Sequence, residues 1–378
     1  MTTVCAADCA SGRPLVAVGG LCRLSADRAQ LTGRLSDSGE RPGNTQTQCG
    51  KNNRLALSSA ANERLRGKES HESRLSSNSM SFKKDTPLVN AVFWAAKRGN
   101  LPLLQLLLNS GRVDADCRDS VGTTALMVAS HGGHYDCVKE LIMQGADINY
   151  QRETGSSALF FSSQHGYHDV VKLLFEFGAS TEFQTKDGGT ALTVACQYGH
   201  SKVVDLLLRN GANVHDQLND GATPLFLAAQ GGHVTVIRHL LSCGAKVNQP
   251  REDGTTPLWI AAQMSHSQVV KVLLSRGADR DAVRLDGSTA LFKAAMKGHN
   301  DVIEELLKFS PSLDLLQNGS TALHAAVMAG NVQTVRLLLG AGADPTLPDQ
   351  KNKLPADLTK SHRILMLLSQ KTRHEGGS

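Results

Sequence analysis

Apolar residues recur in pairs of short helical segments along most of the chain. In one such pair, Leu225, Ala228 and Ala229 lie at helical spacing, and Val236 and Leu240 mark a second apolar stripe with a period of about 3.6 residues. Neither segment is long enough to form a stable helix alone. Each stripe must therefore be buried against a neighbouring pair, which predicts a stack of helical hairpins.

Turn and capping residues separate the segments of this pair. Asp220-Gly221 is a tight-turn signal, because glycine adopts positive φ at little steric cost. Thr223 can cap the following helix, whose first turn tolerates the proline at position 224. Gly232 follows the first segment, where a left-handed residue favours helix termination. Each unit is thus predicted to be a turn followed by two helices.

The same unit repeats with a nearly constant period from about residue 85 onward. A Gly-His pair or its equivalent begins at positions 99, 133, 166, 199, 232, 265, 298 and 330. The intervals are 34, 33, 33, 33, 33, 33 and 32 residues, and one period held over so long a stretch indicates a solenoid. The expected units lie near residues 85–118, 119–151, 152–184, 185–217, 218–250, 251–283, 284–315, 316–348 and 349–369. The sequence therefore predicts an all-α solenoid of eight to nine units over residues 80–369, with a frayed tail at 370–378.

The N-terminal segment differs from the repeats. Residues 1–79 contain no Trp, Tyr or Phe and cannot bury enough apolar surface to offset their ordering entropy, which predicts a disordered extension. Residues 1–84 carry 13 Lys and Arg against 7 Asp and Glu, whereas the rest of the chain has 27 against 28. The repeats thus lack the basic excess of a nucleic-acid-binding domain. Met80 is a candidate internal start, and the basic extension is either a tail without a role or a tether to an acidic partner.

The residue pattern of the units resembles the ankyrin-repeat consensus over residues ~85–369. The matching segments are Thr223-Pro224-Leu225 with Ala228-Ala229, Thr256-Pro257-Leu258 with Ala261-Ala262, and Thr321-Ala322-Leu323-His324. This resemblance implies a stack in which turn fingers project from one edge, first helices line a concave face and second helices a convex face. It also implies protein binding, on the finger tips and the concave face.

Two sets of side chains are the candidates for partner binding, by their position in the repeat. The finger set is mixed in charge and leans acidic, which argues against a phosphate backbone as the ligand: Lys186, Asp187, Asp220, Glu252, Asp253 and Asp286. The first-helix set is a line of amides at 33-residue spacing with four larger neighbours: Gln164, Gln197, Gln230 and Gln263, beside His165, Tyr198, Met264 and Lys297. Such a line can hydrogen-bond along an extended peptide. Alternatively, the glutamines are solvated helix formers, or their amides bond to one another.

Other repeat positions predict structural features. A bulky series is expected to fill the stacking interface: Phe93, Met127, Phe160, Thr193, Phe226, Trp259, Phe292 and His324. Ser265 replaces the glycine that ends the first helix, so local strain is expected. Phe309-Ser310-Pro311 stands where Gly-Ala-Asp is expected, which predicts a loosened joint between units seven and eight.

The sequence contains no motif that is typical of an enzyme active site. It contains no Walker-type loop, GxSxG or HExxH motif. His131, His134 and Cys137 are spaced three apart but lack a fourth ligand, so neither a metal nor a cofactor is expected. The eight cysteines do not show paired spacing, which favours free thiols in a reducing compartment. Cys196, at a paired-alanine position, is expected to be a small buried residue.

The resulting functional hypothesis is a non-catalytic scaffold that binds a partner protein or peptide in the concave groove. A substrate-receptor subunit of a ubiquitin ligase and nucleic-acid association through the basic tail are the alternatives. We expect a monomer without a membrane span, most readily placed in the cytoplasm, with the nucleus as the second choice. Asn149 and Asn248 resemble sites at which ankyrin repeats are hydroxylated, and a hydrogen-bonding role in the turn is the alternative.

Overall fold

The computed structural model describes the backbone of residues 87–313 and 319–375, and side chains as far as residue 371. Within these ranges the chain is helical and has no strand, although an isolated bridge joins Arg118 and Thr124. The prediction of an all-α repeat fold is confirmed for this part of the chain. The expected disorder of residues 1–79 and the candidate start at Met80 lie outside the described residues.

Each of the first eight expected units contains one first helix and one second helix. The first helices are α4 (Pro87–Arg98), α6 (Ala125–Gly132), α8 (Ala158–His165), α10 (Ala191–Tyr198), α12 (Pro224–Gly231), α14 (Pro257–Gln263), α16 (Ala290–Lys297) and α18 (Ala322–Met328). The second helices are α5 (Leu101–Asn109), α7 (Tyr135–Met143), α9 (His168–Glu176), α11 (Ser201–Arg209), α13 (Val234–Ser242), α15 (Ser267–Ser275), α17 (Asn300–Leu307) and α19 (Val332–Gly340). The 3-10 helix η1 (Pro355–Leu358) and α20 (His362–Glu375) follow, so helix continues past the expected boundary at residue 369.

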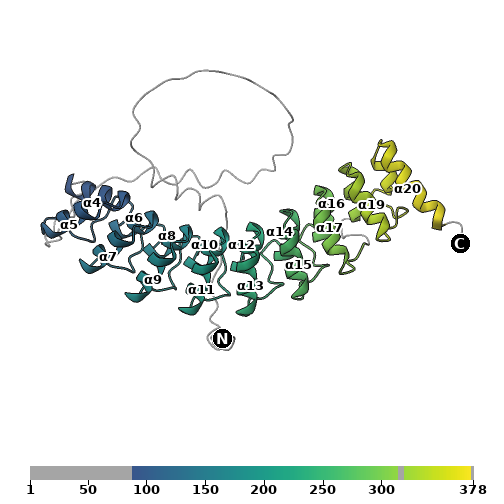
Figure 1. Cartoon of the computed structure of the whole chain (residues 1–378). Coiled ribbons are helices and arrows are strands. Elements are labelled where there is room, and N and C mark those ends of the chain that lie inside the picture. Colours follow the sequence, from purple (N-terminus) through teal and green to yellow (C-terminus); the bar gives the residue numbers. More distant parts are fainter. Residues whose placement is uncertain (1–86, 314–318, 376–378) are drawn as a thin grey trace, which may run out of the picture. The chain divides into compact units, whose positions relative to one another are not determined.

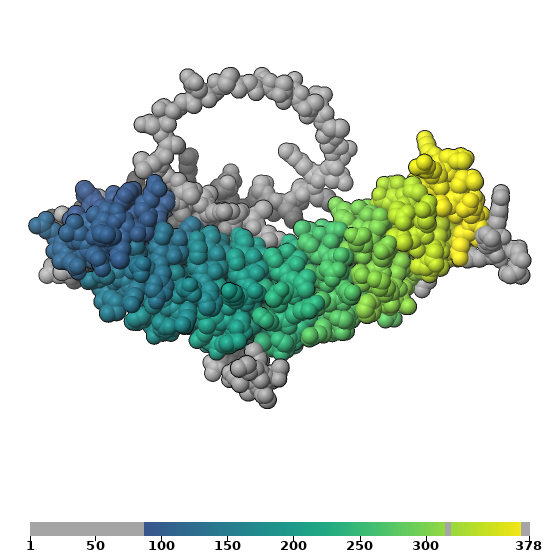
Figure 2. Space-filling view, viewed as in Figure 1, coloured from purple at the N-terminus to yellow at the C-terminus, as the bar shows by residue number. Residues whose placement is uncertain are grey.

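The helices form two rows. Every first helix packs against its own second helix and against the first helices of the neighbouring repeats, and the second helices pack on one another in the same order (Figure 1). Figure 2 shows successive repeats as adjoining bands of side chains. The stack thus buries apolar stripes that no single repeat could bury alone.

A hydroxyl residue begins most of the first helices. Seven N-cap side chains accept a hydrogen bond from the backbone N–H three residues on, at 3.1–3.3 Å: Thr124, Ser157, Thr190, Thr223, Thr256, Thr289 and Thr321. Such caps satisfy backbone donors that the helix itself leaves unpaired. The repeated hydroxyl residue therefore sets where these seven first helices start.

The core lies between the two rows and between successive repeats. The paired alanines Ala228, Ala229, Ala261 and Ala262 are fully buried, which lets first helices approach closely. In the bulky series, six residues are at most 4% exposed: Met127, Phe160, Thr193, Phe226, Trp259 and His324. The prediction that they fill the stacking interface is confirmed. Phe93 and Phe292, nearer the two ends of the series, are only partly buried.

Left-handed glycines end most first helices, and Ser265 occupies the equivalent position after α14. Gly133, Gly166, Gly199 and Gly232 cap their helices with φ between 71° and 78°. Ser265 adopts φ 64° although it carries a Cβ atom. The expected strain is therefore present in the backbone, because side chains disfavour this region by about 1–2 kcal/mol.

Replacing Ser265 with glycine is expected to stabilise the stack by about 1 kcal/mol, since glycine relieves the strain at the cost of a more flexible unfolded chain. Urea unfolding monitored by circular dichroism measures the change. Ser265→Ala is the control, because it removes the hydroxyl but keeps the strain. Equal stabilisation by alanine and glycine would show that backbone conformation is not the cause.

The joint after α17 also departs from the other repeats. Ser310 has φ 50° where the other second helices are followed by glycine, and Pro311 comes next. Residues 314–318 of this joint lie outside the described residues. On either side of them, α16 still packs against α18 and α17 against α19. The loosened joint stays a prediction.

Candidate partner-binding surface

The expected amide line lies at the C-terminal ends of four consecutive first helices, α8, α10, α12 and α14. We call the side chains of Gln164, Gln197, Gln230 and Gln263, together with those of His165, Tyr198 and Met264, the first-helix surface. Gln197, Gln230 and Gln263 are partly exposed, but Gln164 is only 6% exposed. Gln164 therefore offers little surface to a ligand, and the usable line has three amides. The side-chain oxygens of Gln197 and Gln230 are themselves buried and accept no hydrogen bond from the described residues.

Histidines of the following repeats fix the backbone of this line. The Nε2–H groups of His200, His233, His266 and His299 donate to the carbonyl oxygens of Gln164, Gln197, Gln230 and Gln263 at 2.9–3.1 Å. Each carbonyl belongs to the end of a first helix, where helix geometry leaves it unpaired. The histidine of the Gly-His pair thus links one repeat to the preceding one and holds each glutamine in place.

The larger side chains beside the amides are the most accessible part of this surface. Tyr198 is 42% and Met264 46% exposed. The Tyr198 ring stacks on His200, with centroids 6.4 Å apart. His165 packs its ring edge-on to His131, with centroids 4.4 Å apart. Aromatic and methionine side chains next to partly buried amides give the mixture of apolar contact and hydrogen bonding that is common at protein interfaces.

Backbone hydrogen bonds tie neighbouring fingers together. The N–H groups of Lys186 and Glu252 donate to the carbonyls of Thr154 and Asp220 at 2.8 and 2.9 Å. The N–H group of Leu285 donates to the carbonyl of Asp253 at 3.1 Å. These bonds join the Lys186 finger to the preceding one, and they join the fingers of Asp220, Glu252 and Leu285 to one another.

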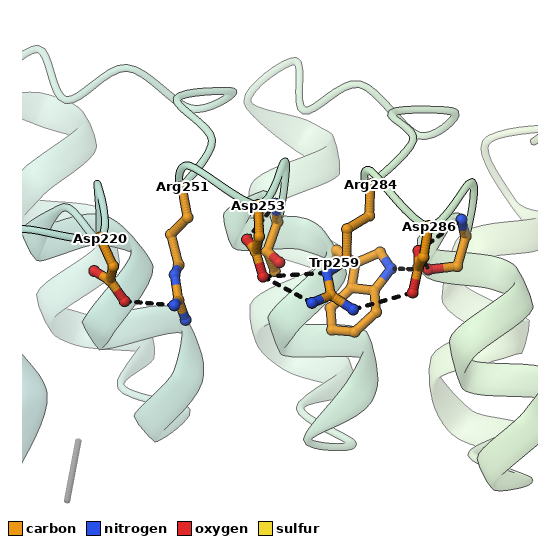
Figure 3. Close-up of polar contacts among 8 residues, drawn as sticks. Asp220, Arg251, Asp253, Trp259, Arg284 and Asp286 are labelled. Atoms are coloured by element: carbon orange, nitrogen blue, oxygen red, sulfur yellow. Dashed lines mark hydrogen bonds and ion pairs between the residues drawn. The ribbon is translucent and has the colours of Figure 1, made fainter. Parts of the chain in front are cut away.

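Ion pairs occupy three of the acidic finger residues. Arg251 pairs with Asp220 of the preceding finger, and Arg284 pairs with Asp253 at 2.8 Å (Figure 3). Arg284 also contacts Asp286 of its own finger at 3.0 Å. These carboxylates were expected to face a partner, and instead they are partly neutralised within the stack. Lys186 and Glu252 remain as exposed charges of the finger set, whereas Asp187 is partly buried.

The same arginines cover aromatic residues of the first helices. The guanidinium carbon of Arg251 lies 5.2 Å from the ring centroid of Phe226, and that of Arg284 lies 5.1 Å from Trp259. The Trp259 indole N–H donates to the Ser288 hydroxyl at 3.1 Å (Figure 3). Sequence reasoning missed Arg251 and Arg284, although their 33-residue spacing and the Asp-Gly that follows each were visible signals.

The Arg284 contacts have an electrostatic consequence for Asp253. Burial alone would raise the pKa of this carboxyl, but hydrogen bonds from Thr255 and Arg284 outweigh it and lower the pKa to about 2. A carboxylate that is so well stabilised by its own chain has less to gain from a partner cation. We therefore regard Asp253 as a link between fingers.

Asn149 and Asn248 make the same contacts in two different repeats. The side-chain N–H of Asn149 donates to the carbonyl of Gly178, and its oxygen accepts from the Ser180 N–H. Asn248 bonds to Gly277 and Asp279 in the same way. These contacts support the hydrogen-bonding role. Hydroxylation of the two asparagines stays a prediction.

Neither a metal cluster nor a reactive thiol is found in the described part of the chain. No three His, Cys, Asp or Glu residues gather there in a metal-binding arrangement. Cys117, Cys137 and Cys196 are free and buried, as expected for Cys196 in particular, and Cys243 is buried as well. Cys5, Cys9, Cys22 and Cys49 lie outside the described residues. Burial raises the pKa of the Cys117 thiol to about 11 and that of Cys196 well above its usual value. The described helices include none with the length and apolar character needed to cross a membrane.

Comparisons with known proteins agree with this architecture. A family model described as ankyrin repeats in three copies matches residues 73–152, 133–217, 210–284 and 276–349. The chain is 87% identical over 289 residues to ankyrin repeat domain-containing protein 29 of Danio rerio, an alignment that covers 76% of this chain and 97% of the relative. It is 85% identical over 292 residues to the Homo sapiens protein of the same name, covering 77% and 97%.

A solved structure gives the same result. The human ASB11 ankyrin repeat domain superposes with a TM-score of 0.54 at 30% sequence identity, covering 59% of this chain and 97% of that domain. Ankyrin repeats are a general protein–protein interaction fold, and the resemblance seen in the repeat consensus is confirmed. The chain belongs to the ankyrin-repeat family.

Proposed function

We propose that this chain is a non-catalytic scaffold that binds a partner protein or peptide on the first-helix surface, centred on Gln197, Gln230 and Gln263. The observation that carries this proposal is the pair of buried amide oxygens at Gln197 and Gln230 that accept no hydrogen bond from the described residues. A buried polar atom without a partner is costly. Rotation of the two amide side chains, which are partly exposed, brings these oxygens to the surface, where the backbone N–H groups of an extended peptide lying along the line can donate to them.

The neighbouring side chains support a protein ligand. Tyr198 and Met264 expose apolar surface on either side of the Gln230 repeat. Their helices are fixed by the inter-repeat histidines, so a partner would meet an ordered surface and little conformational entropy would be lost on binding. The buried free thiols of Cys117, Cys137 and Cys196 favour a reducing compartment, and we place the scaffold in the cytoplasm as a monomer.

Changing Gln197, Gln230 and Gln263 together to alanine tests the proposal. We expect proximity labelling in cells, followed by binding assays with each purified candidate, to show at least a tenfold loss of affinity, about 1.4 kcal/mol. The melting temperature of the variant should stay close to that of the parent protein, because alanine is also a good helix former.

The matched control replaces Gln268 and Gln333, which lie exposed on the second helices α15 and α19, with alanine. This control should keep both the labelled partners and their affinities. If the triple variant retains every partner at unchanged affinity and unchanged melting temperature, the first-helix surface is not the binding site.

A further inference from the structure

One first-helix position breaks its repeat pattern at Lys293. The equivalent residues of six other repeats are apolar and at most 8% exposed: Val128, Phe161, Val194, Leu227, Ile260 and Ala325. Lys293 lies in the middle of α16 and is partly buried. A lysine where the fold buries an apolar residue lowers stability unless its charge is compensated.

No carboxylate of the described residues lies close enough to Lys293 to form an ion pair with it. The Lys293 ammonium lies 5.4 Å from the centroid of the Trp259 ring and forms no ion pair in the described part of the chain. The nearby Asp253 and Asp286 are held by Arg284, and Asp286 also accepts from the Ser288 hydroxyl at 2.5 Å (Figure 3).

Further cations surround Lys293. Burial lowers its pKa most, the positive charges of Lys297 and Arg284 lower it further, and Asp286 acts in the opposite direction. Lys297 lies one helical turn along α16, is exposed and also lacks an ion pair in the described ranges. From the adjoining first helices, α14 contributes no charged residue, and α18 contributes only the fully buried His324. The two lysines thus form a positive patch that has no ion pair among the described residues, and Asp286 offsets the charge of Lys293 only in part.

Apolar side chains adjoin this patch. Met264, 46% exposed, occupies after α14 the position that Lys297 occupies on α16, and the two first helices pack together. Met296 of α16 is partly buried and stands where the preceding repeats carry Gln263 and Gln230. The amide line of the first-helix surface is therefore followed, on α16, by Met296 and the two lysines, with Met264 beside them.

We propose that Lys293 and Lys297 receive an acidic segment of the partner protein, with an apolar residue of that segment placed on Met264. This inference rests on the proposed function and specifies the charge of the ligand. Charge complementarity carries it: two lysines without an ion pair lie beside the exposed Met264, and Lys293 stands at a position where six other repeats bury an apolar residue. Departures from local folding rules gather at functional sites. A nucleic-acid backbone fits less well, because its recognition needs an array of cations and only two unpaired ones lie here.

The test uses the purified full chain and a phage-displayed library of random 16-residue peptides. The parent protein is expected to enrich peptides that carry Asp or Glu next to an apolar residue. These peptides should bind the variant with Lys293→Leu and Lys297→Gln at least tenfold more weakly, and their binding to the parent should weaken as salt is raised. The melting temperature of that variant should equal or exceed that of the parent, because leucine restores the apolar pattern.

Lys202→Leu with Lys271→Gln is the matched control. It removes the same charge from exposed positions on the second helices α11 and α15 and should leave peptide binding unchanged. Enriched peptides without acidic residues, or equal affinity for parent and variant, would overturn the inference. So would tighter capture of single-stranded or duplex DNA through the same two lysines.

The outcomes also separate this inference from the proposed function. Peptides that depend on Gln197, Gln230 and Gln263 but not on the lysines remove the acidic-segment inference and leave the scaffold proposal standing. A library from which no peptide is enriched removes both. A lower melting temperature for the Lys293→Leu variant would show that the lysine stabilises the stack. That result would contradict the argument that a lysine at this apolar position lowers the stability of the fold.

Discussion

The Asp216→Asn variant is expected to gain about 2 kcal/mol of stability relative to the parent protein as the pH is raised from 4 to 7. Asp216 lies in the turn after α11 and is only 2% exposed. Its Oδ2 accepts a hydrogen bond from the Thr190 hydroxyl at 2.7 Å, whereas its buried Oδ1 has no partner among the described residues. Burial raises the pKa to about 6, and the Thr190 hydrogen bond opposes the rise only in part.

The direction of the pH effect follows from this raised pKa. Well below pH 4 the carboxyl is protonated in both the folded and the unfolded chain, so its burial does not lower the free energy of unfolding. Between about pH 4 and 6 unfolding releases a proton, and the free energy of unfolding falls as the pH rises. Above about pH 6 the folded protein holds a buried carboxylate, and the full penalty is present. Asparagine does not titrate, so the variant avoids this loss.

Urea unfolding of both proteins at a series of pH values from 4 to 8 measures the effect. Glu304→Gln, at an exposed position on α17, is the control and should follow the parent curve. Parallel curves for the parent and the Asp216→Asn variant would show that Asp216 does not titrate as its burial implies. The absolute stability of the variant also includes the cost of its buried amide, and the pH dependence is therefore the quantity to compare.

Replacing Gly232 with alanine is expected to lower the free energy of unfolding by about 2 kcal/mol. Gly232 ends α12 with φ 78°, where a Cβ atom is strained. That atom would also lie 2.8 Å from the ring of His266, whose Nε2–H donates to the Gln230 carbonyl at 3.0 Å. The substitution therefore combines backbone strain with displacement of an inter-repeat hydrogen bond. The fold should survive, because the following repeat tolerates Ser265 at the equivalent position.

Gly244→Ala separates these two costs. Gly244 also has a positive φ, 88°, but a Cβ atom there would meet no other atom within 4 Å. Its replacement should cost about 1 kcal/mol, from backbone strain alone. Urea unfolding of both variants gives the comparison. Equal losses at the two positions would mean that the close approach of the next repeat adds nothing.

The repeat architecture could be predicted from sequence because its causes are local. A threonine or serine at the N-cap of most first helices and a glycine after most helices act within a few residues, and the period of about 33 residues shows in the spacing of Gly-His pairs. The expected burial of Trp259 and Phe226 follows from the same periodicity. For these features the position within the unit determines the environment, since every unit meets nearly the same neighbours.

The candidate site was less predictable because it depends on which side chains of different repeats meet. Position in the repeat placed Gln164 with Gln197 and Gln230, but packing buries Gln164 and leaves the other two at the surface. Asp220 and Asp253 were expected to be available to a partner, and arginines from the following fingers occupy them. Lys293 was passed over, since its lack of a counter-ion becomes visible only when Asp286 is seen to be held by Arg284.

The sequence by itself determined the units, their helices, the caps that start and end them and the apolar stripes that make them stack, because each of these depends on contacts within a few residues. Only the tertiary structure decided which charges remain unpaired and which amides remain exposed. The physical reason is that ion pairing and burial depend on the distance between residues about 30 positions apart in the chain, and the stacking of one repeat on the next sets that distance.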